Sequence, residues 1–244
     1  MKIQVFTLFP EMFDGPVNTS IIKRAREKGA VDLELVNIRD FAHDRHAQTD
    51  DYPYGGGAGM VLKADVVIPA LAAFKNNGSH VVYMSPQGKT LNQKKAAALA
   101  AKPHLIILCG HYEGIDERIM TQVDEEISIG DYILTGGEIP ALVVIDAVSR
   151  LLPGVLGCPE SLREESFSGD LLGYPQYTRP PLFQALEVPP PLLSGNHEHI
   201  RLWRKKQSLL KTLLKRPELL LQKQYSAEEK GLLIELLFSG EKMM

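Results

Sequence analysis

The sequence predicts an α/β fold with a parallel sheet, followed by a small all-α C-terminal domain. A strand–turn–helix–strand pattern runs from Val81 to Cys109, and the two strands of such a unit are expected to be parallel. Its second strand, Leu105–Cys109, is a continuous apolar run of the kind found in strands buried on both faces. After Asn196 the chain carries three helical patterns and no strand pattern.

The chain before Val81 alternates between strand and helix patterns. The expected elements are a strand at Lys2–Leu8, a helix from Thr19 or Ser20 to Lys28 that stops at Gly29, a strand at Val31–Ile38, a helix at Asp65–Lys75 and a strand at His80–Met84. The segment 39–60 fits neither pattern and is rich in Asp, His, Arg and Gly. Irregular segments of this length inside a compact domain usually carry function or are disordered.

Two further helices are expected on either side of the second strand of the βαβ unit. Thr90 and Gln93 form a capping-box pattern that would open a helix ending at Ala101. The other helix, 138–151, tolerates Pro140 because the first helical turn needs no donor from that residue.

Glycines mark the ends of successive strand patterns between Leu105 and Arg150. Gly110 follows the apolar strand, Gly130 ends a second apolar piece, and a TGGE motif occupies Thr135–Glu138. In open α/β sheets ligands bind at the carboxyl ends of strands, and glycine lets a backbone approach closely. This stretch therefore predicts one small-molecule pocket.

The composition is that of an ordinary globular protein. Its 244 residues suit one large domain or two smaller ones. A net charge of -3 excludes a uniformly basic surface but allows a local basic patch. Cys109 and Cys158 match no CxxC or metal spacing, which fits a reducing, cytoplasmic setting. There is no signal-peptide profile and no apolar run that could span a bilayer, so we expect no membrane segment.

Basic residues are concentrated in one C-terminal helix. Between Asn196 and Arg216 there are seven Lys and Arg residues against Glu198 alone. The group around Arg201, Trp203 and Arg204 is typical of a nucleic-acid-binding face. A solvated helix with one basic side explains the same pattern.

Several familiar motifs are not met. The glycine-rich segment Tyr54–Gly59 lacks the Gly-Lys-Ser/Thr end of a phosphate-binding loop and the third glycine of a dinucleotide fingerprint, leaving a structural turn or a backbone surface for a ligand. His43, Asp44, His46, Asp50 and Asp51 match neither zinc nor calcium spacing. No GxSxG supports a serine nucleophile.

Taken together, the motifs resemble one family. The resemblance runs almost end to end and in order, through PYGGGAGMV, SPQGKTLNQ, CGHYEGIDERI, SIGDYILTGGEIPA, DAVSRLLPGVLG, EESF, YPQYTRP and LLSGNHEHIRLWR. On these segments the chain is similar to the bacterial tRNA (guanine-37-N(1))-methyltransferase family of the SPOUT superfamily. Each motif alone is weak, and their combination is highly specific.

The resemblance implies a fold that pattern reasoning could not have reached. It implies a parallel α/β sheet whose C-terminal part forms a trefoil knot, although knots run against the general rule for chain connections. The knot would hold S-adenosylmethionine, mostly through backbone groups that glycines leave accessible. The implied cofactor residues are Gly110, Ile129, Gly130, Asp131, Tyr132, Ile133 and Leu134, with Pro86, Tyr112, Glu113, Gly136 and Gly137 close by.

The resemblance also implies a catalytic pair. Guanine N1 must lose a proton while negative charge builds on the neighbouring oxygen, so a base and a cation are needed. The cation matches Arg150 in VSRLLPG. The base matches Glu165 in EESF, where the family usually has aspartate, and Glu164 and Asp170 are rival carboxylates. A magnesium ion is implied as well, with ligands unknown.

Partners and domain roles follow from the same resemblance. It implies a cytoplasmic homodimer in which the linker of one subunit meets the knot of the other. Residues 1–158 would form the catalytic, S-adenosylmethionine-binding domain, 159–173 the linker with the base, and 174–244 a helical tRNA-binding domain. The anticodon stem-loop would contact Asp50, Arg45, His46, Arg201 and Arg204. Two alternatives stay open: a SPOUT methyltransferase acting on another RNA, and an RNA-binding module with a relict pocket.

Overall fold

The computed structural model describes residues 1–157, 164–221 and 223–238. The chain divides into two compact units, Met1–Gly157 and Cys158–Met244. Residues 158–163 lie outside the described residues. They include Cys158, where the first domain was expected to end, and the first part of the expected linker, 159–163.

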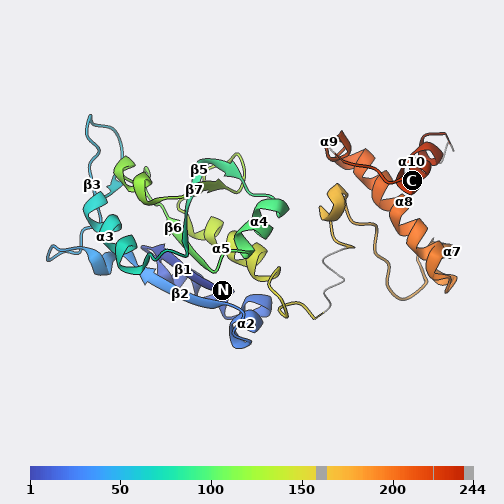
Figure 1. Cartoon of the computed structure of the whole chain (residues 1–244), viewed down its shortest axis with the longest axis horizontal. Coiled ribbons are helices and arrows are strands. Elements are labelled where there is room, and N and C mark those ends of the chain that lie inside the picture. Colours follow the sequence, from blue (N-terminus) through green and yellow to red (C-terminus); the bar gives the residue numbers. More distant parts are fainter. Residues whose placement is uncertain (158–163, 222, 239–244) are drawn as a thin grey trace. The chain divides into compact units, whose positions relative to one another are not determined.

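The first unit is built on a five-stranded parallel sheet, which confirms the predicted α/β class (Figure 1). Its strand order is β2-β1-β6-β5-β7. The strands are β1 (Lys2–Thr7), β2 (Asp32–Asn37), β5 (Ser79–Thr90), β6 (His104–Cys109) and β7 (Glu125–Ser128). All six residues of β6 are buried, as its apolar run predicted.

β5 continues beyond the predicted end of its strand. The residues Ser85–Gly88, expected as a turn, form a bulge, since Met84 and Lys89 both lie opposite Ile127 of β7. The strand therefore passes through Thr90, and the predicted capping box at Thr90 is wrong. Helix α4 (Gln93–Ala100) is instead capped by Asn92, whose Oδ1 accepts a 2.8 Å hydrogen bond from the backbone amide of Lys95.

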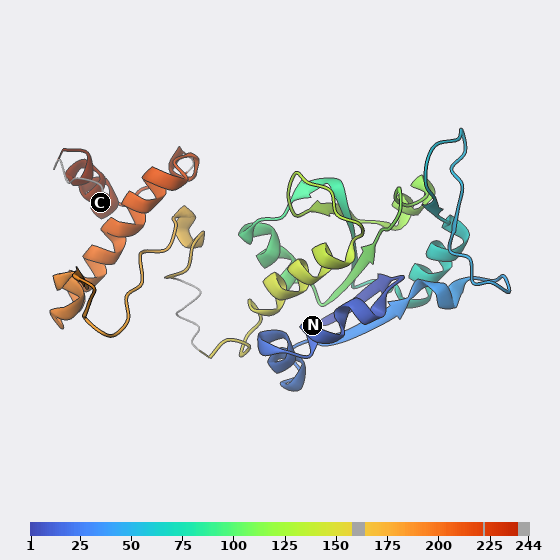
Figure 2. The same cartoon turned by 180° about the vertical axis from the view of Figure 1, so that it is seen from behind.

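Helices cover both faces of the sheet (Figure 2). One face packs against α1 (Asp14–Val17), α2 (Ser20–Glu27), α4 and α5 (Glu138–Ser149), and the other against α3 (Ala64–Phe74) and the 3-10 helices η2 (Ile38–Phe41) and η3 (Glu117–Gln122). A further 3-10 helix, η1 (Pro10–Phe13), precedes α1. Helix α2 ends before Gly29, whose φ of +70° is the expected left-handed stop.

A small antiparallel hairpin, β3 (Asp50–Asp51) with β4 (Val61–Leu62), interrupts the predicted irregular segment. Figures 1 and 2 show the chain between these strands projecting from the body of the unit. Leu62 also forms a parallel bridge with Ile115, which ties the hairpin to the loop after β6.

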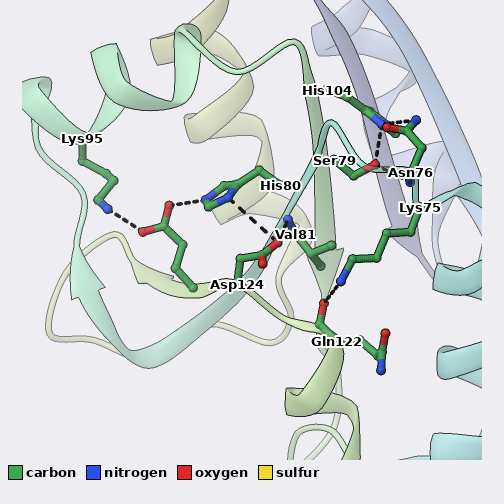
Figure 3. A network of polar contacts seen from close by, with 10 residues as sticks. Lys75, Asn76, Ser79, His80, Val81, Lys95, His104, Gln122 and Asp124 are labelled. Carbon is green, nitrogen blue, oxygen red and sulfur yellow. Dashed lines mark hydrogen bonds and ion pairs between the residues drawn. The ribbon is translucent and has the colours of Figure 1, made fainter.

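A polar network fixes the amino ends of the strands, opposite the end where the glycines gather (Figure 3). His80 in β5 bonds Glu125 in β7 at 2.8 Å, and Lys95 pairs with the same carboxylate. Burial opposes ionisation of Glu125, yet the hydrogen bonds from Lys95 and His80 lower its pKa. In β6, His104 bonds Gln4 of β1 at 2.8 Å, so the starts of β1, β5, β6 and β7 are all anchored.

The second unit is mostly helical. Its elements are η4 (Ser168–Asp170), β8 (Leu182–Phe183), β9 (Leu186–Glu187), α7 (Pro190–Leu193), α8 (His197–Lys215), α9 (Glu218–Leu221) and α10 (Ala227–Phe238). The β8–β9 pair is a strand element that an all-α expectation does not contain. A capping box opens α10: Ser226 N donates to Glu229 Oε2 at 2.9 Å, and Glu229 N donates to Ser226 Oγ at 3.1 Å.

Candidate nucleotide pocket and substrate contacts

A cavity of about 360 Å³ lies at the carboxyl ends of β6 and β7, beside the bulge of β5. Three loops line it, and they come from segments well separated in the chain. Of the expected cofactor residues it gathers Pro86, Gly110, Tyr112, Glu113, Ile129, Gly130, Tyr132, Ile133, Leu134, Gly136 and Gly137. Asp131 is exposed and is not among the lining residues. The volume lies in the range of small-molecule sites.

Glycines let two of these loops touch through their backbones. The amide of Gly137 donates a 2.8 Å hydrogen bond to the carbonyl of Gly110. A Cβ on Gly137 would lie 2.7 Å from Cys109 Cα, and one on Gly110 would lie 2.7 Å from the Tyr83 hydroxyl. A side chain at Gly137 would push the two loops apart, and one at Gly110 would displace the Tyr83 ring.

The loop after β7 presents apolar side chains at the rim of the cavity. Gly130 has φ +147°, and Ser128 Oγ bonds both its amide and its carbonyl at 3.1 Å, which fixes the turn. Tyr132, Ile133 and Leu134 follow with 55%, 79% and 40% of their surfaces exposed. Adjacent exposed apolar residues at a cavity mark a surface that a ligand or partner covers.

Tyr83 and His111 also line the cavity, and sequence reasoning missed both. Burial raises the pKa of Tyr83 to about 12, so its hydroxyl remains a hydrogen-bond donor at neutral pH. His111 Nδ1 is buried and has no hydrogen-bond partner among the described residues. A buried polar atom without a partner calls for one, and a ligand in the cavity can supply it. In the sequence only their positions mark them: Tyr83 lies near the strand end before SPQG, and His111 directly follows Gly110.

Cys109 lies beneath the pocket and is not a nucleophile candidate. It is fully buried, and burial, reinforced by the charge of Glu138, raises the pKa of its thiol. Glu138 is itself buried and accepts a 2.7 Å hydrogen bond from Thr7 Oγ1, which attaches the start of α5 to β1.

The two expected catalytic residues lie in different units. Arg150 is the half-buried C-cap of α5 in the first unit, and Glu165 is half-buried in the second. Glu164, a rival for the base, hydrogen-bonds the Tyr174 hydroxyl and pairs with Arg204 at 3.4 Å. These contacts give Glu164 a structural role. The turn that carries Glu165 is held by a 3.0 Å bond from Gly173 N to Ser166 Oγ.

The expected substrate residues of the first unit lie on and before β3. Arg45 and His46 are exposed, and the loop is held by Asp44, which accepts hydrogen bonds from the amides of His46 and Gln48. The bond from His46 is the main reason that the pKa of Asp44 is lowered. Asp50 is half-buried, and its Oδ1 accepts a 3.3 Å bond from Thr49.

The basic helix α8 is partly committed to helix packing. Arg201 pairs with Glu198 and with Glu228 of α10, while Lys205 and Lys206 pair with Glu229 and Glu235 at 2.8 Å. Arg204 lies over the Tyr174 ring, 4.8 Å from its centre. Arg201, Lys205 and Lys206 therefore hold α10 against α8. A smaller part of the α8 surface is left for contact with a nucleic acid.

The described residues contain no group of three or more His, Cys, Asp or Glu side chains that could hold a metal ion. In the same residues no helix is both long and apolar enough to cross a membrane.

Comparisons with known proteins agree with this geometry. The model of the family described as tRNA (Guanine-1)-methyltransferase TrmD matches residues 1–222. A tRNA (guanine-N(1)-)-methyltransferase of Syntrophomonas wolfei is 64% identical over 99% of both chains. Relatives of the same name from Carboxydothermus hydrogenoformans and Dictyoglomus turgidum are 62% and 54% identical, over 96% and 97% of this chain and 92% and 96% of theirs. The chain therefore belongs to the tRNA (guanine-1)-methyltransferase TrmD family.

Proposed function

We propose that this protein transfers a methyl group from S-adenosylmethionine to N1 of guanosine 37 in tRNA, next to the anticodon. The observation that carries the proposal is the cavity itself, which brings together motif glycines from the loops after β6 and β7. Membership of the family supports the reaction, and a cavity of about 360 Å³ fits a nucleoside-sized cofactor.

The cofactor residues are those that line the cavity. Bound S-adenosylmethionine supplies an electrophilic methyl group on its sulfonium. The main-chain groups around Gly110 and between Ile129 and Leu134 would hold it, and the Tyr83 hydroxyl, protonated at neutral pH, would add a hydrogen-bond donor. Asp131 faces solvent at the turn and stays a candidate through its backbone alone.

A trefoil knot is part of the proposal. The chain leaves the edge strand β7, returns to β6 through the Gly137–Gly110 hydrogen bond, and continues as α5 with Ala141, Val144 and Ile145 fully buried. This return path, which crosses β5, supports a knot in which α5 would pass through the loop formed by the chain before it.

The chemistry divides between Glu165 and Arg150. Glu165 takes the proton from guanine N1, the nitrogen lone pair forms the new bond to the methyl carbon, and the carbon–sulfur bond breaks. The Arg150 guanidinium stabilises the negative charge that builds on the guanine oxygen. The described residues contain no group of three or more His, Cys, Asp or Glu side chains for the magnesium ion that the resemblance implies, and the roles given above are those of protein groups.

A cytoplasmic homodimer completes the site. In it, the linker of one subunit brings Glu165 to the cofactor pocket and Arg150 of the other. The exposed Ile133 and the outward residues Ile139 and Val143 of α5 give the first unit an apolar surface for a second copy. Residues 1–158 act as the catalytic domain, 159–173 as the linker, and 174–244 as a tRNA-binding domain.

The anticodon stem-loop is bound by residues of both units. Asp50 reads a guanine edge through its carboxylate, while the exposed Arg45 and His46 contact the phosphate backbone. Arg201 and Arg204 act through α8, where pairing with carboxylates competes with phosphate. The target base leaves its stack to reach the methyl group.

The test is transfer of labelled methyl from S-adenosylmethionine to tRNA transcripts. A transcript with guanosine at position 37 should be labelled, and one with adenosine there should not. Equal labelling of both would indicate a SPOUT enzyme acting on another RNA site. No labelling of any tRNA, with the cofactor bound, would favour an RNA-binding module with a relict pocket.

A further inference from the structure

We propose that Tyr54, at the tip of the β3–β4 hairpin, is a stacking platform for an unpaired base of the RNA substrate. The inference rests on the proposed function and adds to it a residue that recognises the loop by its π-face.

The ring of Tyr54 is fully in solvent. It is 102% exposed and Tyr52 is 78% exposed, whereas most other aromatic rings of the first unit are buried or packed. Neither tyrosine ring has a ring partner or a side-chain hydrogen bond among the contacts of the described residues. Tyrosine offers a large flat apolar surface at low entropic cost, and an unpartnered one on a projecting loop marks a contact surface.

The tip around Tyr54 presents backbone instead of side chains. Gly55, Gly56 and Gly57 have φ of +88°, +78° and +133°, a region that favours glycine. A Cβ on Gly55 or Gly56 would meet nothing within 4 Å. Open space beside bare backbone lets a planar ligand reach the ring and the neighbouring amides together.

The base of the hairpin is held rigidly at the rim of the cofactor cavity. Glu113 N bonds Met60 O at 3.1 Å, Leu62 N bonds Gly114 O at 3.0 Å, and Asp116 N bonds Leu62 O at 2.9 Å. Gly59 packs so closely on the Glu113 side chain that a Cβ would lie 2.5 Å from it. Glu113 and Gly114 both line the cavity, so the base of the hairpin that carries Tyr54 lies beside it.

An exposed cation follows the segment that anchors the hairpin, because Arg118 is two residues after Asp116, whose amide bonds Leu62 O. Arg118 is 72% exposed and is oriented by two hydrogen bonds to Asp116, at 2.9 and 2.6 Å. Hydrogen bonding to Asp116 is the main cause of its raised pKa. An exposed aromatic face and an exposed guanidinium on segments joined by backbone hydrogen bonds suit a nucleobase with its phosphate, which is how proteins bind single-stranded RNA. An unstacked base of the anticodon loop is the occupant this chemistry fits.

Equilibrium binding of a fluorescent anticodon stem-loop tests the proposal without depending on methyl transfer. It uses the full chain saturated with S-adenosylhomocysteine and the variants Tyr54→Phe, Tyr54→Leu and Tyr54→Ala. Phenylalanine keeps the π-face, and leucine keeps apolar bulk without it. The Kd of Tyr54→Phe should stay within about twofold of the wild type, while leucine and alanine should weaken binding about tenfold or more. The Kd for S-adenosylhomocysteine should be unchanged in all three.

Three results would overturn the proposal: wild-type affinity in Tyr54→Ala, equal affinity in Tyr54→Leu and Tyr54→Phe, or a parallel loss of cofactor affinity. The last would show that the hairpin supports the pocket instead of the RNA. A wild-type protein that binds the stem-loop but does not methylate it contradicts the proposed function, and the comparison of Tyr54 variants still stands. If the stem-loop does not bind to the wild-type protein at all, both the proposed function and the role of Tyr54 are contradicted.

Discussion

The amide of Gly137 and the carbonyl of Gly110 are joined by a 2.8 Å hydrogen bond between the loops that follow β7 and β6. These loops meet although the strands β7 and β6 are separated by β5. The bond closes one wall of the cavity, and no side chain can be added to Gly137 without moving the backbone of Cys109 and Gly110.

Gly137→Ala should therefore damage the pocket. Its Cβ would lie 2.7 Å from Cys109 Cα and 3.0 Å from Gly110 N, and backbone neighbours cannot yield cheaply. We expect a loss of about 1–3 kcal/mol in stability and at least about tenfold in cofactor affinity. Calorimetric titration with S-adenosylmethionine and thermal unfolding measure the two. Gly15→Ala is the matched control, because its Cβ meets nothing within 4 Å and its φ is not positive. Equal behaviour of the two variants would refute the close-approach explanation.

Arg150→Ala should abolish turnover and leave the cofactor in place. Arg150 is not a lining residue of the cavity, so the Kd for S-adenosylmethionine should not change. Loss of one charge-stabilising group costs about 10²–10³ in rate. Single-turnover methylation with saturating tRNA separates this from a binding defect. A variant that keeps its rate, or loses cofactor affinity, contradicts the assigned role.

The base is tested by comparing two carboxylates of the second unit. Glu165→Gln should lower the single-turnover rate by about 10²–10⁴ because proton removal fails, and Asp170→Asn should lower it far less. The variant Glu165→Asp, which restores the residue usual in the family, should retain substantial activity. The opposite ranking of Glu165→Gln and Asp170→Asn would show that the base is Asp170, in the 3-10 helix η4.

Glu229 should stabilise the second unit in a pH-dependent way. Burial opposes its ionisation, yet hydrogen bonds from Lys205, the Ser226 amide and Lys223 lower its pKa from 4.5 to about 2. A lowered folded-state pKa gives stability that is complete above the unfolded value and is lost as the pH falls from 4.5 towards about 2.

Glu229→Gln should accordingly destabilise this unit by about 2–3 kcal/mol at neutral pH, because it leaves two lysines facing a neutral amide. The difference from wild type should shrink as the pH falls below 4.5. Thermal unfolding followed by circular dichroism measures both. Glu235→Gln, in the more exposed pair with Lys206, should cost at most about 1 kcal/mol. A constant difference across this pH range would be incompatible with the proposed linkage.

Local patterns were enough to predict most strands and helices of the first unit and the place of the cavity, whereas most of its lining residues were implied by the family resemblance. The apolar run of β6 and the glycines at strand ends are signals carried by neighbouring residues, and Gly110 and Gly130 line the cavity as expected. Thr90 was misjudged because the bulge keeps β5 paired with β7 beyond Met84. Pairing across strands is invisible in a local capping pattern.

Contacts between distant segments explain the other omissions. Tyr83 and His111 line the cavity because of their neighbours in space: Gly110 lies against the Tyr83 ring, and His111 Nδ1 is buried without a hydrogen-bond partner among the described residues. Sequence spacing does not reveal such contacts. The basic character of α8 was plain in the sequence, but its carboxylate partners on α10 lie more than twenty residues further along the chain. A charge pattern alone therefore overstated the surface left for RNA.

Mapping the methylated nucleoside tests the central claim most directly. After incubation of the full chain with S-adenosylmethionine and unmodified tRNA, nuclease digestion and mass spectrometry should find 1-methylguanosine. Primer extension should stop immediately before position 37, and Arg150→Ala, at the same enzyme concentration and time, should reduce both signals by about 10² or more. A methyl group on another base, or on another atom of guanine, would contradict the account.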